Sequence, residues 1–573
     1  MKKRKLIIIL VSLFSLIALI SCGTKEEEST PVDDFSDFEQ VGGDNEENIP
    51  GYVPLELSTY EGENYIFDDN VTNKDGSVCY EIFVRSFYDT NNDGIGDFNG
   101  VKQQLPYLYE LGVKTLWLMP IMPSPTYHGY DVIDYYDVNP EYGTMEDFET
   151  LIEESKLYNI DIMIDIVFNH SSTQNPWFIQ SYKDYVSNNT SEDSKKDWYC
   201  WSDQNATGYH VYNGVKTAFY ESRFDHSMPD FNTKNEAVRA EMVNILKYWV
   251  DKGVKGFRFD AVKYFDYGNT QYNVEFMSFL HDEITKDHPE IYFVGECWDN
   301  VDIINNYYKS TFESFFTFGS SLDSSGDATI VGQVKGFTSA NSFATKIENR
   351  ERIMKENNPN AYSSYFLSNH DMDRSSKNFN VSEYAKLAAS LYLLLPGTPY
   401  IYYGEEIGLK GARVTSPDDA SDARRRLAMI WSSDNKVGEC GFPEPHRTDL
   451  MNNDQVTVGA YDQMQTNYSL FNHYKKVIQI RNKYPFIKDS VFINLTPLLV
   501  TKYDNVLAYE LTYEGQSIII IHNFEKVNVE VDLSQMPVGA LLDEVSVARL
   551  IPELSGNNLK LGKMSTVIFA KRN

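Results

Sequence analysis

Short runs of apolar residues alternate with longer stretches of helical period along most of this chain. Such alternation is typical of a parallel sheet whose strands are joined by crossover helices. Eight runs have the length of a strand, and they cover residues 78–87, 113–119, 160–168, 254–261, 291–297, 315–318 (the weakest), 362–368 and 399–403. Eight strands separated mostly by helix-sized intervals favour a closed barrel over an open doubly wound sheet. We therefore predict an α/β fold, specifically a (β/α)8 TIM barrel.

Two stretches depart from this rhythm. Residues 171–232, after the third run, are long, polar and aromatic with weak helical periodicity, which indicates an inserted subdomain. Beyond about Pro485, strand-like runs at 506–513, 517–522 and 527–533 follow one another without helices, which indicates an antiparallel β-sandwich. The expected domains are a barrel at 51–170 and 233–485, an insertion at 171–232 and a C-terminal β domain at 486–573.

The N-terminus has the pattern of an export signal over residues 1–21. A basic start precedes an apolar stretch at 6–20, which is short for a bilayer span. The stretch ends in Leu-Ile-Ser-Cys-Gly, which resembles the lipobox of bacterial lipoproteins and implies a lipid on Cys22; an ordinary signal peptide is the alternative. Residues 22–50 are acidic and poor in large apolar side chains, so we expect a flexible tether. The expected location is extracytoplasmic, lipid-anchored to the bacterial cell membrane or cell surface.

Composition narrows the possible partners. A net charge of −32 argues against nucleic acid and against anionic lipid headgroups, which require a basic face. A neutral substrate is easier to accommodate, and the 40 Tyr, 33 Phe and 7 Trp suit both packing and sugar stacking. We expect a monomer. Four cysteines follow the lipobox: Cys79, Cys200, Cys297 and Cys440. They show no close pairs and no metal-type spacing, so we expect buried thiols; one disulfide among them is the alternative.

Ionisable residues stand at the ends of several predicted strands. Arg258 and Asp260 are two apart on one strand, so their side chains point to the same side. A cation beside a carboxylate keeps it ionised, as a nucleophile requires, although a purely structural ion pair has the same pattern. Glu296 follows the next strand beside Trp298, and desolvation there would raise its pKa toward that of a general acid.

Two further strands lead into Asn-His pairs, at Asn169-His170 and at Asn369-His370-Asp371. In a parallel barrel, the carboxyl ends of all strands open on one face. We therefore expect the side chains from these four strand ends to converge there, although they lie far apart in sequence.

These four segments resemble, in order and spacing, the signature regions of the α-amylase superfamily of glycoside hydrolases, over roughly residues 77–573. The resemblance implies that Asp260 is the nucleophile, Glu296 the general acid/base and Asp371 a transition-state stabiliser in a retaining double displacement. The two acting carboxyl groups should then lie about 5 to 5.5 Å apart. The expected substrate-binding residues are His128, Tyr130, His170, Arg258, Lys263, Trp298 and His370.

A separate loop at residues 89–97 places oxygen-bearing side chains at alternate positions around a Gly turn, a spacing that suits Ca²⁺. It differs from an EF-hand because its closing ligand comes early and no helix precedes it. Similar loops in relatives of oligo-1,6-glucosidases imply the ligands Asp89, Asn91, Asp93, the Ile95 carbonyl and Asp97. A second calcium site would use Asn169 and Asp230. The alternative is a metal-free Asn/Asp turn.

Finer motifs bear on specificity. The segment Met-Pro-Asp-Phe-Asn at 228–232 resembles the signature of the group between oligo-1,6-glucosidases and neopullulanases, with Phe for Leu. Ala261 and Lys263 are similar to the residues at these positions in α-1,4-acting members. Tyr264 departs from the usual Lys-His pair, so the sequence does not assign the contacts to the sugar on the leaving-group side. The resemblance implies hydrolysis of α-1,4-glucosidic bonds in starch, maltodextrin and related α-glucans. An α-glucosidase or a 4-α-glucanotransferase would use the same residues, and an inactive glucan-binding protein would not need all three carboxylates.

Overall fold

The computed structural model describes residues 65–68, 70–71, 73, 76–321, 329–379, 381–416, 419–433, 438–450, 455–547 and 550–572. The predicted signal peptide, the acidic tether and Cys22 lie outside these residues. The contacts place Glu47–Asn573 in one unit. Over the described ranges, no helix combines the length and the apolar character that a bilayer span needs.

Eight parallel strands form a single sheet in the order β10-β9-β8-β7-β3-β2-β1-β11. They are β1 (Cys79–Ile82), β2 (Thr115–Leu118), β3 (Asp161–Ile166), β7 (Gly256–Phe259), β8 (Tyr292–Gly295), β9 (Ser314–Phe316), β10 (Tyr362–Ser364) and β11 (Tyr400–Tyr402). A parallel bridge between Phe366 and Tyr400, and a 2.8 Å bond from Thr398 N–H to the Ser363 carbonyl, join the two outer strands. The sheet therefore closes, and the predicted TIM barrel is confirmed.

Most strands are shorter than the apolar runs that predicted them. The first run continues past β1 into a 3₁₀ turn, η1 (Val84–Ser86), and the sixth continues past β9 into η3 (Phe318–Ser320). Val84, Phe87 and Phe318 remain buried in these turns. Apolar character thus marked burial correctly, but it did not mark where the strand hydrogen bonds end.

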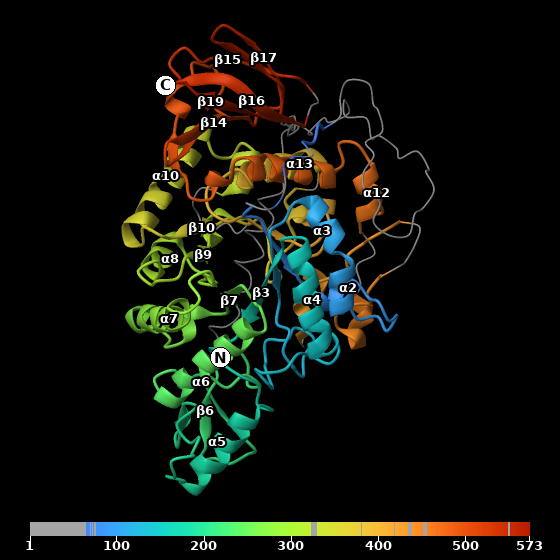
Figure 1. Ribbon diagram of the computed structural model, residues 1–573. Coiled ribbons are helices and arrows are strands. Elements are labelled where there is room, and N and C mark those ends of the chain that lie inside the picture. The colour runs from blue at the N-terminus through green and yellow to red at the C-terminus, as the bar shows by residue number, and fades with distance from the viewer. Residues whose placement is uncertain are drawn as a thin grey trace, which may run out of the picture. The chain divides into compact units, whose positions relative to one another are not determined.

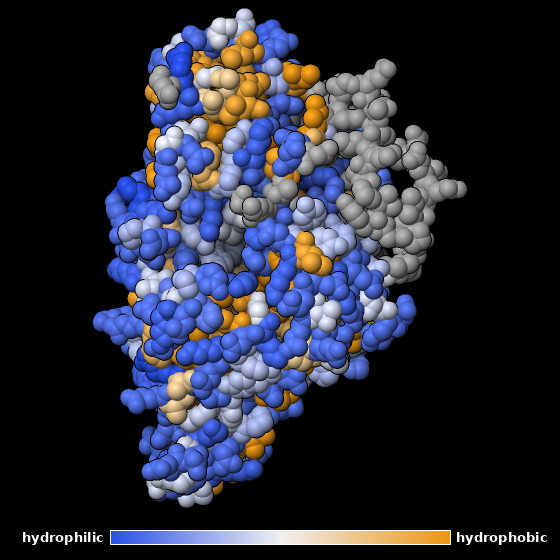
Figure 2. All heavy atoms as spheres, viewed as in Figure 1, coloured by the Kyte–Doolittle hydropathy of each residue, from blue (hydrophilic) through white to orange (hydrophobic). Residues whose placement is uncertain are grey.

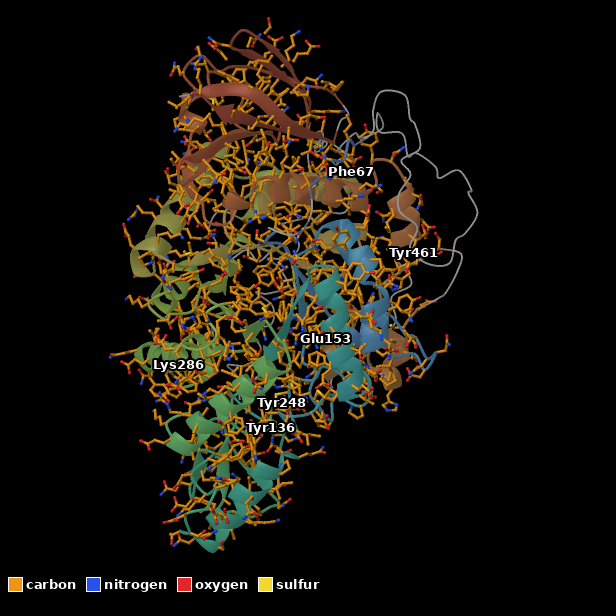
Figure 3. The ribbon with its side chains drawn as sticks, in the orientation of Figure 1. Phe67, Tyr136, Glu153, Tyr248, Lys286 and Tyr461 are labelled. Atoms are coloured by element: carbon orange, nitrogen blue, oxygen red, sulfur yellow. The ribbon has the colours of Figure 1, made fainter. Side chains whose placement is uncertain are left out.

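Helices surround the strands, with α7 and α8 on the left of the view and α3 and α4 on the right (Figure 1). Polar N-caps start many of them; Thr144 and Asp147, for example, form a capping box at α4. Aromatic contacts fix neighbouring elements: the rings of Tyr136 and of Tyr248 in α6 meet edge to face at 5.2 Å (Figure 3). The helices are α2 (Phe98–Gln103), α3 (Leu105–Leu111), α4 (Met145–Leu157), α6 (Glu236–Asp251), α7 (Thr270–Thr285), α8 (Val301–Tyr307), α9 (Ile330–Val334), α10 (Ala340–Asn357), α11 (Ser382–Tyr392), α12 (Ala460–Gln465) and α13 (Leu470–Lys483).

The predicted insertion contains α5 (Pro176–Ser187) and a three-stranded antiparallel sheet of β4 (Trp201–Ser202), β6 (Phe219–Glu221) and β5 (Tyr209–Val211). Its aromatic residues serve packing, since Trp201 stacks on both Phe178 (5.4 Å) and Tyr185 (5.1 Å). An isolated bridge between His170 and Asp230 ties its end to the residues that follow β3. The insertion is therefore anchored at the carboxyl end of the barrel.

The C-terminal region is a sandwich of two antiparallel sheets, as predicted. One sheet has β12 (Val491–Asn494), β13 (Val506–Tyr513), β14 (Gln516–Asn523), β19 (Ser565–Lys571) and β16 (Val538–Ser546), and the other has β15 (Val529–Asp532), β18 (Asn558–Leu561) and β17 (Glu553–Ser555). Ile519, Val531 and Phe569 from both sheets share one apolar core. Some apolar side chains stay outside, among them Leu541, Leu542 and Leu554, and Figure 2 shows hydrophobic residues gathered over this domain at the top of the view.

Candidate active site

A cavity of about 520 Å³ opens where the barrel strands end. The three predicted catalytic carboxylates all line it, although they lie far apart in sequence. Eight of the ten residues predicted for catalysis and substrate binding form its wall: Asp260, Glu296, Asp371, His128, Tyr130, His170, Lys263 and Trp298. The other two, Arg258 and His370, are fully buried beneath it and contact the lining carboxylates.

Arg258, in β7, contacts three carboxylates at the base of the cavity. Its Nη1 lies 2.7 Å from Asp260 Oδ1 and 2.9 Å from Asp165 Oδ1, and its Nη2 lies 3.4 Å from Glu296 Oε2. One guanidinium thus offsets part of the mutual repulsion of three buried acidic groups. It also fixes Asp260 and Glu296 relative to each other.

The backbone at Ala261, directly after Asp260, positions the carboxyl group of Glu296. Ala261 has φ 51°, a left-handed conformation that residues with a side chain seldom adopt. In this conformation its N–H donates a 2.8 Å hydrogen bond to Glu296 Oε2. A strained residue beside the predicted nucleophile therefore helps to position the second carboxyl group.

The environment of Glu296 suits a proton donor. Burial raises its pKa to about 7, aided by the negative charges of Asp260 and Asp371 and opposed by Arg258. Near neutral pH a substantial fraction of Glu296 is therefore protonated. That is the state a general acid requires.

Asp371 stays ionised for the opposite reason. Burial works against its charge, but His370 Nε2 at 3.0 Å and Arg426 Nη2 at 2.9 Å lower its pKa well below the usual range. Burial would also lower the pKa of His370, yet Asp371 and Glu81, whose Oε1 accepts from Nδ1 at 2.5 Å, raise it to about 9. A buried imidazolium therefore holds the Asp371 carboxylate in place.

Two of these partners, Glu81 and Arg426, were missed by the sequence predictions. Glu81 sits inside the first apolar run and gives no signal of its own. Arg426 ends a run of three arginines, Arg424 to Arg426, which was a recognisable sign of a charged rim. Asp165, which binds both Arg258 and the Tyr130 hydroxyl (3.1 Å), was likewise not among the predicted site residues.

Aromatic and imidazole rings complete the wall. Tyr130 stacks on His370 with centroids 5.5 Å apart and planes 17° apart. Burial lowers the pKa of His128 to about 3, with Arg426 adding to the effect, and burial also lowers the pKa of His170. Both rings are thus neutral at pH 7. The buried Nε2 of His170 has no hydrogen-bond partner among the described residues and lines a cavity that would admit a neutral hydroxyl group.

Lys263 and Trp298 are joined at the rim. Lys263 Nζ donates to the Trp298 carbonyl at 2.5 Å and pairs with Asp299 at 3.1 Å. The Trp298 ring stacks on Phe318 with centroids 4.9 Å apart. Both side chains predicted to bind substrate are therefore held by contacts of their own, at the side of the cavity where Glu296 lies.

The predicted calcium loop is a tight turn rich in acidic groups. The Asp89 carboxylate accepts from the N–H groups of Asn91, Asn92 and Gly94, and Asp97 caps α2 through Gly100 N–H at 2.7 Å. Asp89, Asp93 and Asp97 all lie near enough to the buried Cys440 to add to the burial that raises the pKa of its thiol. At the second predicted site, Asn169 Nδ2 and Asp230 Oδ1 are 3.2 Å apart.

In the part of the chain that the structure describes, no group of three or more His, Cys, Asp or Glu side chains is arranged to hold a metal ion. Cys79, Cys200, Cys297 and Cys440 are free thiols. The disulfide that the sequence left open is therefore not formed among them.

A closed (β/α)8 barrel with three carboxylates in one cavity at its carboxyl-terminal rim, one with a raised pKa and one held ionised, is typical of a class of enzyme, the glycoside hydrolases. Comparison with known sequences is more specific. The family described as "Alpha amylase, catalytic domain" matches residues 81–490, well over half of the chain, so the chain belongs to this family.

Individual relatives are similar to this chain in sequence and in structure. Alpha-amylase 3 of Dictyoglomus thermophilum is 36% identical over 456 residues, which cover 79% of this chain and 85% of that protein. The oligo-1,6-glucosidase of Bacillus cereus is 28% identical and covers 78% of this chain and 90% of its own length. Among solved structures, Eubacterium rectale Amy13B superposes with a TM-score of 0.81 at 34% identity, covering 91% of this chain and all of that one.

Proposed function

We propose that this enzyme is a retaining glycoside hydrolase that cleaves α-1,4-glucosidic bonds in starch, maltodextrin and related α-glucans. The observation that carries the proposal is the shared cavity of Asp260, Glu296 and Asp371, in which Glu296 has a pKa of about 7. The uncharged character of His128 and His170 suits a substrate that offers hydroxyl groups and no charge.

In the proposed mechanism, Glu296 donates its proton to the glycosidic oxygen while Asp260 attacks the anomeric carbon. The bond from that carbon to the leaving sugar breaks, and a covalent glycosyl ester forms on Asp260. Asp371, kept ionised by His370 and Arg426, stabilises the positive charge that develops on the sugar ring. Glu296, now a carboxylate, takes a proton from water, which attacks the same carbon and releases Asp260.

Product analysis tests this proposal against two alternatives favoured by particular relatives. One relative is an oligo-1,6-glucosidase, and another is the 4-alpha-glucanotransferase of Thermotoga neapolitana, which is 33% identical over 347 residues. We expect mixed maltooligosaccharides from starch and a rapid loss of viscosity. Glucose released one unit at a time would indicate an α-glucosidase, longer oligosaccharides from maltotriose a transferase, and unchanged substrate a glucan-binding protein.

We also propose that the loop of residues 89–97 binds Ca²⁺ through Asp89, Asn91, Asp93, the Ile95 carbonyl and Asp97. Support comes from its all-oxygen set of donors, which hard cations prefer, and from the gathering of three aspartates around one turn. Asn169 and Asp230 are proposed as a second site. The ion in the loop would have a structural role, since none of the residues 89–97 lines the active-site cavity.

Chelation should therefore lower the melting temperature. A hundredfold excess of ligand over its Kd stabilises the folded state by about 2.7 kcal/mol, so calcium added to chelated enzyme should raise Tm by about two to three degrees in a chain of this size. Asp93→Asn keeps the acceptor oxygen that binds Ile95 N–H but removes the charge, and it should abolish this response. Asp251→Asn, at an exposed aspartate ending α6, is the matched control. Equal Tm values with calcium and with chelator would contradict the proposal.

We further propose that residues 1–21 direct export and that Cys22 anchors the enzyme to the membrane through lipid. Cys22→Ser should move the protein from the membrane fraction to the soluble fraction in a bacterial host. A wild-type protein that is soluble and carries no lipid mass would rule the anchor out.

A further inference from the structure

The imidazole ring of His370 lies below the active-site cavity with a carboxyl group at each of its two nitrogens. Nδ1 is 2.5 Å from Oε1 of Glu81, in β1, and Nε2 is 3.0 Å from Oδ2 of Asp371. The ring is fully buried, and the Glu81 side chain is 2% exposed. Because Glu81 does not line the cavity, it contacts the ring and not the space for substrate.

Only a doubly protonated ring satisfies both of these contacts. An ionised carboxylate accepts hydrogen bonds and cannot donate them, and a neutral imidazole carries a single N–H. In a neutral ring, one bare nitrogen would therefore face a carboxylate oxygen in the protein interior, where an unmade hydrogen bond is costly. An imidazolium donates from both nitrogens, so the geometry favours the charged form of His370.

The hydroxyl group of Tyr130 agrees with this assignment. Its oxygen lies 2.6 Å from His370 Nε2, and the hydroxyl donates to Asp165 Oδ2 at 3.1 Å. A tyrosine hydroxyl has one proton to donate, so it can serve Asp165 only when Nε2 of His370 carries a proton of its own. The hydrogen bonds around the ring are therefore mutually consistent when His370 is an imidazolium.

The surrounding charges also favour the imidazolium. Among the described residues, His370 is the only cation within ion-pair distance of Glu81. Although burial opposes the charge, Asp371 and Glu81 raise the pKa of His370 to about 9. The other titratable and charged groups around this pair come from the neighbouring strands and loops of the barrel: Tyr130, Asp165, Arg258, Tyr402 and Arg426.

We propose that Glu81 is a positioning residue of the reaction: it keeps His370 charged, and the charged ring holds the Asp371 carboxylate where the transition state needs it. This inference rests on the proposed function. Without the charge of Glu81, His370 should lose its proton within the working pH range of the enzyme. The ion pair between His370 and Asp371 would then weaken, and with it the stabilisation of the positive charge that develops on the sugar ring.

Glu81→Gln tests the proposal, because the amide has the shape of the carboxylate and lacks its charge. NMR spectra of enzyme labelled with ¹³C-histidine report the protonation of His370, whose signal is the one absent from His370→Asn. In the wild type, a measurement that needs no variant of Glu81, this signal should titrate near pH 9. In Glu81→Gln the midpoint should fall by at least about one pH unit. Glu81→Asp, which keeps the charge, should restore most of this difference.

A rate profile connects the charge of His370 to catalysis. The substrate is α-maltosyl fluoride, because fluoride departs without a proton from Glu296. For the wild type, kcat/KM should stay level until about one pH unit below the pKa of His370. For Glu81→Gln it should fall about tenfold as the pH rises through the midpoint measured for His370, since hydrogen bonds between charged partners are about twice as strong as neutral ones. A merely structural role of Glu81 would lower kcat/KM equally at every pH.

Glu351→Gln is the matched control. Glu351, in α10, is also a buried glutamate, its Oε1 accepts from the hydroxyl groups of Ser363 (2.6 Å) and Tyr365 (2.7 Å), and it does not line the cavity. Its pH profile and its His370 midpoint should equal those of the wild type. A wild-type His370 that is neutral at pH 7, or a Glu81→Gln variant with an unchanged midpoint or profile shape, would overturn the inference and leave the proposed function intact. A wild-type enzyme that cleaves neither maltoheptaose nor the fluoride would overturn the proposed function and the inference with it.

Discussion

Asp260→Asn should reduce kcat on maltoheptaose by on the order of 10⁴-fold or more, with little change in melting temperature. The amide has the shape of the carboxylate and can still contact Arg258, whose Nη1 lies 2.7 Å from Oδ1. It cannot form the glycosyl ester, because a neutral amide is too weak a nucleophile. Loss of turnover in a folded protein would therefore identify a chemical role and not a structural one.

A control substitution separates this role from the loss of an ion-paired carboxylate on a barrel strand. Asp161→Asn removes a carboxylate at the start of the barrel strand β3, where Asp161 pairs with Lys114 at 3.0 Å. We expect its kcat to stay within about twofold of the wild type. If Asp260→Asn retained a tenth or more of the wild-type activity, Asp260 would not be the nucleophile.

Glu296→Gln should have the second largest effect, and the size should depend on the leaving group. On maltoheptaose, kcat/KM should fall by about 10²- to 10⁴-fold, the usual contribution of a general acid. On α-maltosyl fluoride the fall should be far smaller, because fluoride departs without a proton. Since kcat/KM covers the steps up to departure of the leaving group, the later role of Glu296 as a base does not affect this comparison.

The pH profile follows from the same residue. The pKa of Glu296 is raised to about 7, and its protonated form is the active one. For wild-type enzyme, kcat/KM on maltoheptaose should therefore level off about one pH unit below this pKa and fall tenfold per pH unit well above it. Glu296→Gln should lack this decline. Equal losses on both substrates, or a decline unchanged in the variant, would exclude Glu296 as the acid.

Spacing along the sequence predicted those contacts of the site that join residues of the same strand. Arg258 and Asp260 share a strand, so a spacing of two placed them on one side, and the structure puts 2.7 Å between their charged atoms. The eight apolar runs likewise predicted the barrel, because buried parallel strands are apolar on both faces.

Contacts that depend on the closed fold could not be predicted in this way. Glu81 and His370 are 289 positions apart and meet because β1 and β10 flank β11 in the closed barrel. The left-handed backbone of Ala261 has no signature, since alanine gives no sign of a positive φ. The contact between the rings of Phe224 and Tyr264 also depends on the insertion, because these residues are 40 positions apart in sequence.

The most direct test of the retaining mechanism is the anomeric configuration of the first product. Proton NMR spectra taken during the first minutes of maltoheptaose hydrolysis, before mutarotation, distinguish the two anomers. Two successive displacements at one carbon, through Asp260 and then water, predict that the new reducing ends appear as the α-anomer. A β-anomer at the earliest times would mean a single displacement by water and would contradict the role of Asp260.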